Sequence, residues 1–149
     1  MGFVERDGDL FAATDLDAVA HGVNCVGVMG AGFAKLVRAT WPLTYYAYKQ
    51  ACKEGTLQPG GMLRDKQGNM LIYHLASQNK PGPDARLEWI ASSVAEMLQN
   101  ADALVQPMRI GMPRIGSRIG GLQWPAVRAV IEPLAVAARS ELVVFHYDG

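Results

Sequence analysis

The chain has 149 residues, 50% of them hydrophobic, which suits one domain, residues 1–149, with a full-sized core. Its 14 basic residues balance its 14 acidic ones, so no net field attracts a nucleic-acid backbone, and non-specific DNA binding is disfavoured. The apolar runs are shorter than the ~20 residues that span a bilayer, so we expect no membrane association. Cys25 and Cys52 form no CxxC motif and no secretory signal precedes them, so we expect a cytoplasmic protein without a metal site.

The first elements predicted are a short extended segment over residues 3–6 and an apolar strand over 18–23. A glycine-rich segment follows, and a helical pattern begins at about Ala31. This helix should end near Trp41-Pro42, because a proline disfavours helical geometry in the residue before it. The order strand, glycine loop, helix is typical of phosphate-binding segments.

A second helix and a hairpin come next. The helix is predicted over Thr44 to Lys53, with Thr44 as its N-cap and Gly55 after its end. Residues 62–64 and 70–75 are strand-like and flank a polar stretch, so they predict a hairpin with a turn of four or five residues.

The second half of the chain continues the alternation. A helix is predicted from about Ala85, a strand over 108–112, and a helix that opens at Trp124-Pro125. Pro133 lies inside that last helix and should kink or divide it. A final strand covers 142–147. Strands alternating with helices predict a three-layer α/β fold.

Two glycine stretches are the candidate ligand site. Gly27, Gly30 and Gly32 follow the 18–23 strand and allow the backbone to approach a ligand, while the helix start directs unpaired N–H groups at it. The stretch from Ile115 to Gly121 lies likewise between a strand and a helix, so the two loops could clamp one diphosphate. The alternative is a pair of tight turns without a ligand. Neither a Walker A loop nor a dinucleotide fingerprint matches this spacing.

Several segments, taken together and in order, resemble the macrodomain, an ADP-ribose-binding α/β/α module. They match the branch of terminal ADP-ribose protein glycohydrolases, DNA ADP-ribosyl glycohydrolase antitoxins and ADP-ribose 1″-phosphate phosphatases. The matching segments are Gly8-Asp9-Leu10-Phe11, Val23 to Ala34, Trp41-Pro42, Pro113 to Trp124 and the terminal strand. The resemblance implies a three-layer α/β/α fold with a central mixed sheet, and ADP-ribose or a derivative as ligand.

The resemblance also implies roles for individual residues. Asp9 would accept a hydrogen bond from the adenine amine, and the alternative is a turn or capping aspartate. Asn24 would lie by the distal ribose, the alternative being an asparagine that satisfies backbone groups at a strand end. Tyr147 or Phe145 could pack on the adenine or its ribose, or be core strand residues. The expected ligand-contacting residues are Asp9, Leu10, Gly27, Val28, Met29, Gly30, Ala31, Gly32, Phe33, Ile115, Gly116, Ser117, Arg118, Ile119, Gly120, Gly121 and Tyr147.

Two positions depart from the family pattern. The glycohydrolases of this branch use a lysine shortly after the hairpin, and the equivalent position here is Gln78, whose amide cannot act as a nucleophile. Lys80 could substitute if the loop is rearranged, the alternative being a solvated loop lysine. The protein-directed members also use an acid in the second loop, where this chain has Gly120. A lysine-dependent ADP-ribosyl hydrolase is therefore doubtful.

His21 is the remaining titratable group near the first loop. An unperturbed imidazole titrates near pH 6.5, which suits general acid or base catalysis, and the phosphatase members carry a histidine here. His21 and Asn24 are the candidate catalytic residues. They differ by an odd number, so both reach one ribose only if the backbone bends, as Gly22 permits. The alternative is a core strand histidine.

Three functions fit these observations. We favour a hydrolase that removes a group from the distal ribose of an ADP-ribose derivative, either the 1″-phosphate or an ADP-ribosyl linkage to protein or DNA. The alternatives are a non-catalytic reader or sponge of ADP-ribose or a related nucleotide, and a surface for protein contacts. We expect a monomer that needs no cofactor.

Overall fold

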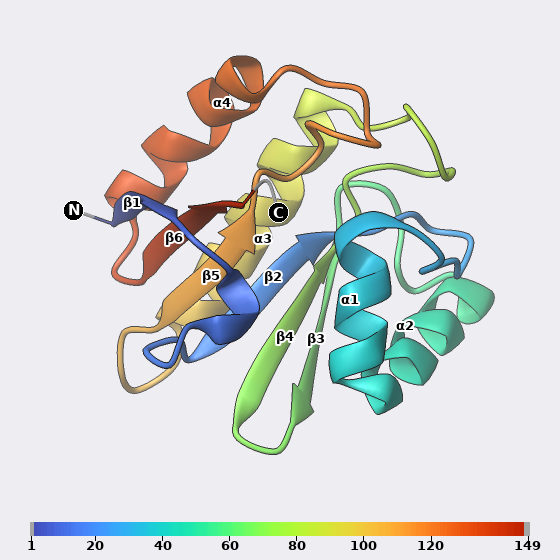
Figure 1. Ribbon diagram of the computed structural model, residues 1–149, viewed down its shortest axis with the longest axis horizontal. Coiled ribbons are helices and arrows are strands. Elements are labelled where there is room, and N and C mark those ends of the chain that lie inside the picture. The colour runs from blue at the N-terminus through green and yellow to red at the C-terminus, as the bar shows by residue number, and fades with distance from the viewer. Residues whose placement is uncertain (1, 148–149) are drawn as a thin grey trace.

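The computed structural model describes residues 2–147 and has a six-stranded mixed sheet at its centre (Figure 1). Neighbouring strands pair in parallel, except that β3 runs antiparallel to β4 at one edge. The strands in their order across the sheet are β1 (Phe3–Asp7), β6 (Glu141–His146), β5 (Arg109–Pro113), β2 (Ala18–Gly22), β4 (Met70–Leu75) and β3 (Met62–Gln67).

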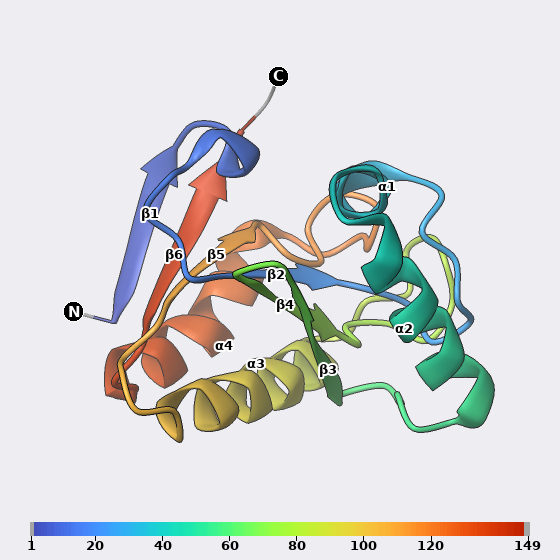
Figure 2. The ribbon, with the colours of Figure 1, turned by 90° about the horizontal axis from the view of Figure 1, so that it is seen from below.

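Helices cover both faces of the sheet, which confirms the predicted three-layer α/β/α fold with a central mixed sheet. In Figure 2 the pair α1 (Gly32–Thr40) and α2 (Pro42–Glu54) lies on one side, and α3 (Leu87–Asp102) and α4 (Trp124–Ala137) lie on the other. A short 3-10 helix, η1 (Leu10–Ala12), follows β1. Within the described residues no helix has the length and apolarity to cross a membrane.

The larger core lies under α3 and α4. Ile90, Val94 and Met97 of α3 have no exposed surface and pack with Val127 and Ile131 of α4 against the sheet. Two smaller clusters lie on the other face, under α1 and α2 and around η1. This packing holds the strand ends in place, from which the ligand loops extend.

Helix α1 agrees with the prediction, but the start of α2 does not. The chain enters α1 at the N-cap Ala31, and α1 ends before Trp41. Trp41 is also the N-cap of α2, and Pro42 occupies its first turn, where the missing N–H costs nothing. The prediction of Thr44 as N-cap was wrong, because Thr44 is buried inside the helix.

The hairpin and α4 also differ from expectation. Strand β3 continues to Gln67, so the turn has two residues, Gly68-Asn69, rather than four or five. Gly68 supplies the positive φ of +58° that such a turn needs. Pro133 does not divide helix α4, and it lies on the exposed face, where water can satisfy the carbonyl that loses its hydrogen bond.

Candidate functional site

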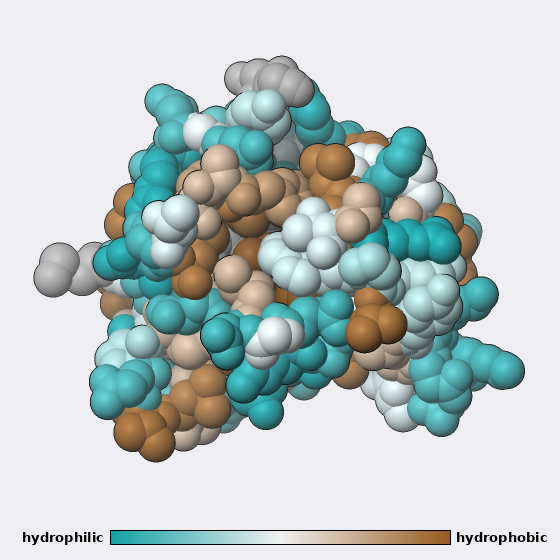
Figure 3. Space-filling view, turned by 60° about the horizontal axis from the view of Figure 1, so that its bottom comes forward, coloured by the Kyte–Doolittle hydropathy of each residue, from teal (hydrophilic) through white to brown (hydrophobic). Residues whose placement is uncertain are grey.

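A cleft of about 830 Å³ opens at the carboxyl ends of β2, β5 and β6, between the two glycine loops. In open α/β sheets, ligands bind at this end of the strands. The first loop runs from the end of β2 to α1, and the second from the end of β5 to α4. In the space-filling view, hydrophobic residues gather around a hollow near the middle of the face shown (Figure 3).

Most of the residues predicted for the site line this cleft. They are Asp9, Leu10, Asn24, Val28, Gly30, Ala31, Gly32, Phe33, Ile115, Gly116, Ser117, Arg118, Ile119, Gly120 and Tyr147. Four predicted residues do not line it: His21, Gly27, Met29 and Gly121. Met29 is only 1% exposed and packs in the core beneath the loop. Gly27 faces Lys49 of α2, and Gly121 faces Pro83. These two glycines shape the loops through their positive φ angles of +82° and +86°.

Asn24 is the hydrogen-bonding centre of the first loop. Its Oδ1 accepts from the backbone N–H of Val26 at 3.1 Å, the N–H of Val28 at 3.3 Å and the hydroxyl of Tyr48 at 2.7 Å. Its Nδ2 donates to the Val28 carbonyl at 2.9 Å. The second N–H of this amide is the group that a ligand hydroxyl could use. Asn24 therefore holds the loop and lines the cleft at the same time.

Backbone contacts and close-packed glycines hold the second loop. The Leu122 N–H donates to the Gly116 carbonyl at 2.9 Å, and the Ala85 N–H donates to the Gly120 carbonyl at 3.2 Å. A Cβ on Gly120 would lie 2.8 Å from the Gly116 carbonyl oxygen, so only glycine fits there. The Ser117 hydroxyl donates to the Arg114 carbonyl at 2.7 Å, which closes the turn.

The end of the cleft near η1 combines one carboxylate with aromatic rings. Oδ1 of Asp9 accepts from the Phe11 N–H at 2.9 Å, so Asp9 caps η1 as well as lining the cleft. The Phe11 and Phe33 rings stack with centroids 5.0 Å apart. Tyr147 is 53% exposed, whereas Phe145 is 5% exposed and also packs in a core cluster. A planar base would find apolar walls and an acceptor here.

His21 lies in the core and has no surface exposed to the cleft. Its Nε2 is 2.7 Å from Nδ1 of His74, whose Nε2 is 2.9 Å from the Thr44 hydroxyl. Burial, with a smaller effect of the His74 charge, lowers the pKa of His21 well below its usual value. Burial also lowers the pKa of His74 to about 4. Both rings are neutral at pH 7. The geometry favours the role of a core histidine for His21 over that of a general acid or base.

The comparisons with known proteins agree with this geometry. The model of the Macro domain family matches residues 20–131. The chain belongs to the macrodomain family.

Among curated relatives, the DNA ADP-ribosyl glycohydrolase of Thermus aquaticus is 28% identical over 95% of this chain and 39% of its own length. That of Mycobacterium tuberculosis is 30% identical over 80% of this chain and 35% of its own. The chain thus spans well under half of these two relatives. Human ADP-ribose glycohydrolase OARD1 is 29% identical over 93% of this chain and 87% of its own.

Solved structures agree on the fold. The macrodomain of Thermus aquaticus DarG superposes with a TM-score of 0.86 at 26% identity, covering 99% of this chain and 98% of that one. Thermosipho africanus DarTG, solved in complex with ADP-ribose, gives a TM-score of 0.84 at 21% identity over 93% of this chain and 39% of that one.

In this macrodomain the two departures from the family pattern have structural consequences. Gln78 lines the cleft, but its amide nitrogen Nε2 donates to the carbonyls of Lys80 at 2.6 Å and Gly82 at 2.9 Å. It thereby holds its own loop. Lys80 is exposed and is not among the cleft-lining residues. At Gly120 any side chain would collide with the loop backbone, so an acid there would need a different loop conformation.

Some lining residues of the macrodomain were missed. Gly22, Ser77 and Pro113 stand at or just after the ends of β2, β4 and β5, and a Cβ on Gly22 would lie 2.6 Å from the Ser77 hydroxyl. The parallel strand ends were the signal that could have found them. The other missed residues are Phe11, Val23, Ala34, Leu36, Pro81, Gly82, Arg114, Gln123, Trp124 and Pro125.

Proposed function

We propose that this macrodomain binds ADP-ribose in the cleft and hydrolyses a bond to the distal ribose of an ADP-ribose derivative. The observation that carries the proposal is the cleft of about 830 Å³ between two amide-rich loops at the strand ends. Relatives matched over most of this chain are named for ADP-ribosyl or ADP-ribose glycohydrolases, which supports hydrolysis. An ADP-ribose 1″-phosphate phosphatase of Meyerozyma guilliermondii, 38% identical over 84% of this chain, supports the same reaction class.

The adenine, the diphosphate and the distal ribose of ADP-ribose can each be assigned to a part of the cleft. Asp9 and the Phe11–Phe33 pair would hold the adenine, since a carboxylate accepts from its exocyclic amine and rejects a guanine oxygen. The backbone amides of the two loops and the start of α1 would bind the diphosphate. The distal ribose then lies toward Asn24 and Gln78.

Catalysis in this arrangement rests on positioning and electrostatics. The cleft-lining residues with titratable side chains are Asp9, Arg114, Arg118 and Tyr147. Loop amides and guanidinium groups would stabilise negative charge that develops on the leaving group, and Asn24 would orient the ribose or an attacking water. Proton transfer by His21 stays a prediction, and it requires that the ring leave its contact with His74.

A second function, a non-catalytic reader of ADP-ribose, is favoured by one observation. Gln78 stands where related glycohydrolases have a lysine, and its amide is bound to its own loop. A reader needs the cleft and both loops but no nucleophile.

Product analysis separates the two functions. The protein would be incubated with ADP-ribose 1″-phosphate, ADP-ribosylated DNA and ADP-ribosylated protein, and the products separated by chromatography. Release of ADP-ribose from one of them by the wild type, and its loss in Asn24→Ala, supports the hydrolase. If the wild type binds ADP-ribose and turns over none of the three at any pH, the protein is a reader. In that case Gln78→Lys tests whether an amine at this position creates hydrolase activity.

A further inference from the structure

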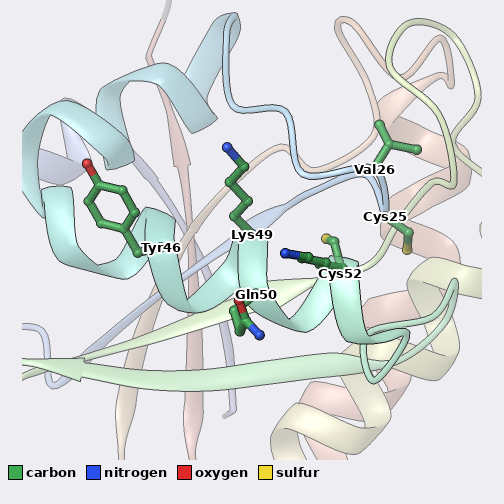
Figure 4. A pocket seen from close by; sticks show the side chains of 7 residues that line it. Cys25, Val26, Tyr46, Lys49, Gln50 and Cys52 are labelled. Atoms are coloured by element: carbon green, nitrogen blue, oxygen red, sulfur yellow. The ribbon is translucent and has the colours of Figure 1, made fainter.

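A second hollow, which we call the α2 groove, lies on the outer side of the first loop. It has a volume of about 410 Å³ and is lined by Cys25, Val26, Tyr46, Lys49, Gln50, Cys52 and Lys53. Figure 4 shows Tyr46, Lys49, Gln50 and Cys52 along α2, with Cys25 and Val26 on the neighbouring loop. The proposed function uses none of these side chains.

The α2 groove carries uncompensated positive charge. Lys49 and Lys53 are four residues apart on one face of α2, both are exposed, and neither forms an ion pair within residues 2–147. Between Asp17 and Glu54 the chain has four basic residues and no acidic one. Burial raises the pKa of the Cys25 thiol to about 11, so this thiol adds no negative charge. The groove is therefore locally positive, although the net charge of the chain is zero.

The groove also presents an aromatic ring and apolar surface. Tyr46 is 63% exposed and Val26 53% exposed. Exposed aromatic rings beside lysines are the combination that binds single-stranded nucleic acid, because bases stack on the ring while the cations contact the phosphates. An acidic peptide would use the lysines alone and leave the ring unused.

The groove and the cleft share one wall. Asn24 and Val28 of the first loop line the cleft, whereas Cys25 and Val26 line the groove. The Cys25 thiol donates to the backbone carbonyl of Gln78 at 3.6 Å, and Gln78 lines the cleft. The α2 groove therefore lies on the other side of the loop segment that carries Asn24, next to the end of the cleft where the distal ribose is proposed to bind.

We propose that the α2 groove binds the phosphodiester backbone and a base of a single-stranded nucleic acid, with Lys49 and Lys53 at the phosphates and Tyr46 stacked on the base. This inference rests on the proposed function, because it assigns the groove to the strand that carries the ADP-ribosyl group. The groove is an accessory surface, and its residues do not touch the bond that is cleaved.

Fluorescence anisotropy with a labelled oligothymidylate of about 12 nucleotides tests the groove. The wild type should bind the oligonucleotide at low salt, and Lys49→Glu and Lys53→Glu should each weaken binding about tenfold. Tyr46→Ala should weaken it by a smaller factor, about threefold to tenfold. Lys66→Glu is the matched control, an exposed lysine on β3 near the hairpin turn, and it should bind as the wild type does.

Three results would overturn the inference: no binding by the wild type, equal weakening by Lys66→Glu, or a polyglutamate peptide that binds as well and does not depend on Tyr46. The same variants titrated with ADP-ribose should keep wild-type affinity. If the wild type does not bind ADP-ribose, the proposed function is contradicted instead. Failure of the groove proposal and failure of the proposed function are therefore distinguishable.

Discussion

The two glycine loops face each other across one cleft and are built in different ways. Side-chain hydrogen bonds hold the first loop, and they meet at Asn24, to which Tyr48 of α2 also donates. The second loop is held mainly by backbone hydrogen bonds and by closely packed glycines, with one side-chain hydrogen bond from Ser117. The conformation of the first loop should therefore be disrupted by the loss of one polar side chain. That of the second loop should be disrupted by the addition of a methyl group to a glycine.

The largest effect is expected for Asn24→Ala. It removes the acceptor of two loop amides and of the Tyr48 hydroxyl, and the amide that lines the cleft. Turnover of the substrate found by product analysis should fall by about two to three orders of magnitude. Gln78→Ala, which removes an amide bound to its own loop, should change turnover little. Wild-type turnover in Asn24→Ala would show that the first loop does not depend on this side chain.

The next largest effect is expected in the pH dependence of stability. It probes the buried contacts from His21 to His74 and from His74 to Thr44 of α2. Burial keeps His21 and His74 neutral in the folded state, so the unfolded chain binds more protons as pH falls below about 6.5. The free energy of unfolding should drop by about 2 kcal/mol or more between pH 7 and pH 5.

Urea denaturation at both pH values measures this drop. A His21→Gln, His74→Gln double variant is the control and should lose most of the difference. If that variant does not fold, a wild-type stability that stays constant between pH 7 and pH 5 would still contradict the account.

A smaller loss of stability distinguishes the packing of the two loops. Gly120→Ala places a Cβ 2.8 Å from the Gly116 carbonyl oxygen, and should lower the free energy of unfolding by about 1–3 kcal/mol. Gly30→Ala in the first loop meets its nearest atom at 3.8 Å, so it should change stability by less than about 0.5 kcal/mol. Equal effects of the two substitutions, measured by chemical denaturation, would erase the distinction.

The smallest effect is expected for Tyr48→Phe. The Tyr48 hydroxyl is 2.7 Å from Oδ1 and 2.8 Å from the backbone oxygen of Asn24, and it links α2 to the first loop. Its loss should weaken ADP-ribose binding by up to about tenfold, the scale of one net hydrogen bond. Tyr73→Phe is a matched control, since the hydroxyl of this buried tyrosine donates to Oδ1 of Asn100, near the end of α3, at 2.9 Å. If calorimetry finds that both variants lose the same affinity for ADP-ribose, the proposed link between Tyr48 and the first loop is contradicted.

Local patterns in the sequence predicted the three-layer α/β fold and the two glycine loops, whereas the mixed sheet and the site roles of Asp9, Asn24 and Tyr147 followed only from the resemblance to macrodomains. Strand and helix periodicity placed the layers, and glycine spacing placed the two loops at the strand ends. The prediction failed where an element's end depends on tertiary contacts. Threonine is a residue type that is common at N-caps, yet the Thr44 hydroxyl contacts His74 of β4, a neighbour that the sequence does not reveal.

The direction of side chains could not be predicted either. His21 and Asn24 are three residues apart, and the sequence left open whether a bend at Gly22 would bring both to one ribose. In the structure His21 faces His74 inside the protein while Asn24 lines the cleft. The pairing of His21 with His74 joins residues 53 positions apart, and only the parallel register of β2 and β4 brings them together.

The central claim is that the cleft binds ADP-ribose with its adenine at Asp9, and titration calorimetry tests it most directly. The wild type should bind ADP-ribose with roughly micromolar affinity, about −8 kcal/mol, and GDP-ribose more weakly. Asp9→Ala should reduce the affinity for ADP-ribose about tenfold to a hundredfold, because a charge-assisted hydrogen bond is lost. No heat with ADP-ribose, or an unchanged affinity in a folded Asp9→Ala protein, would contradict the account.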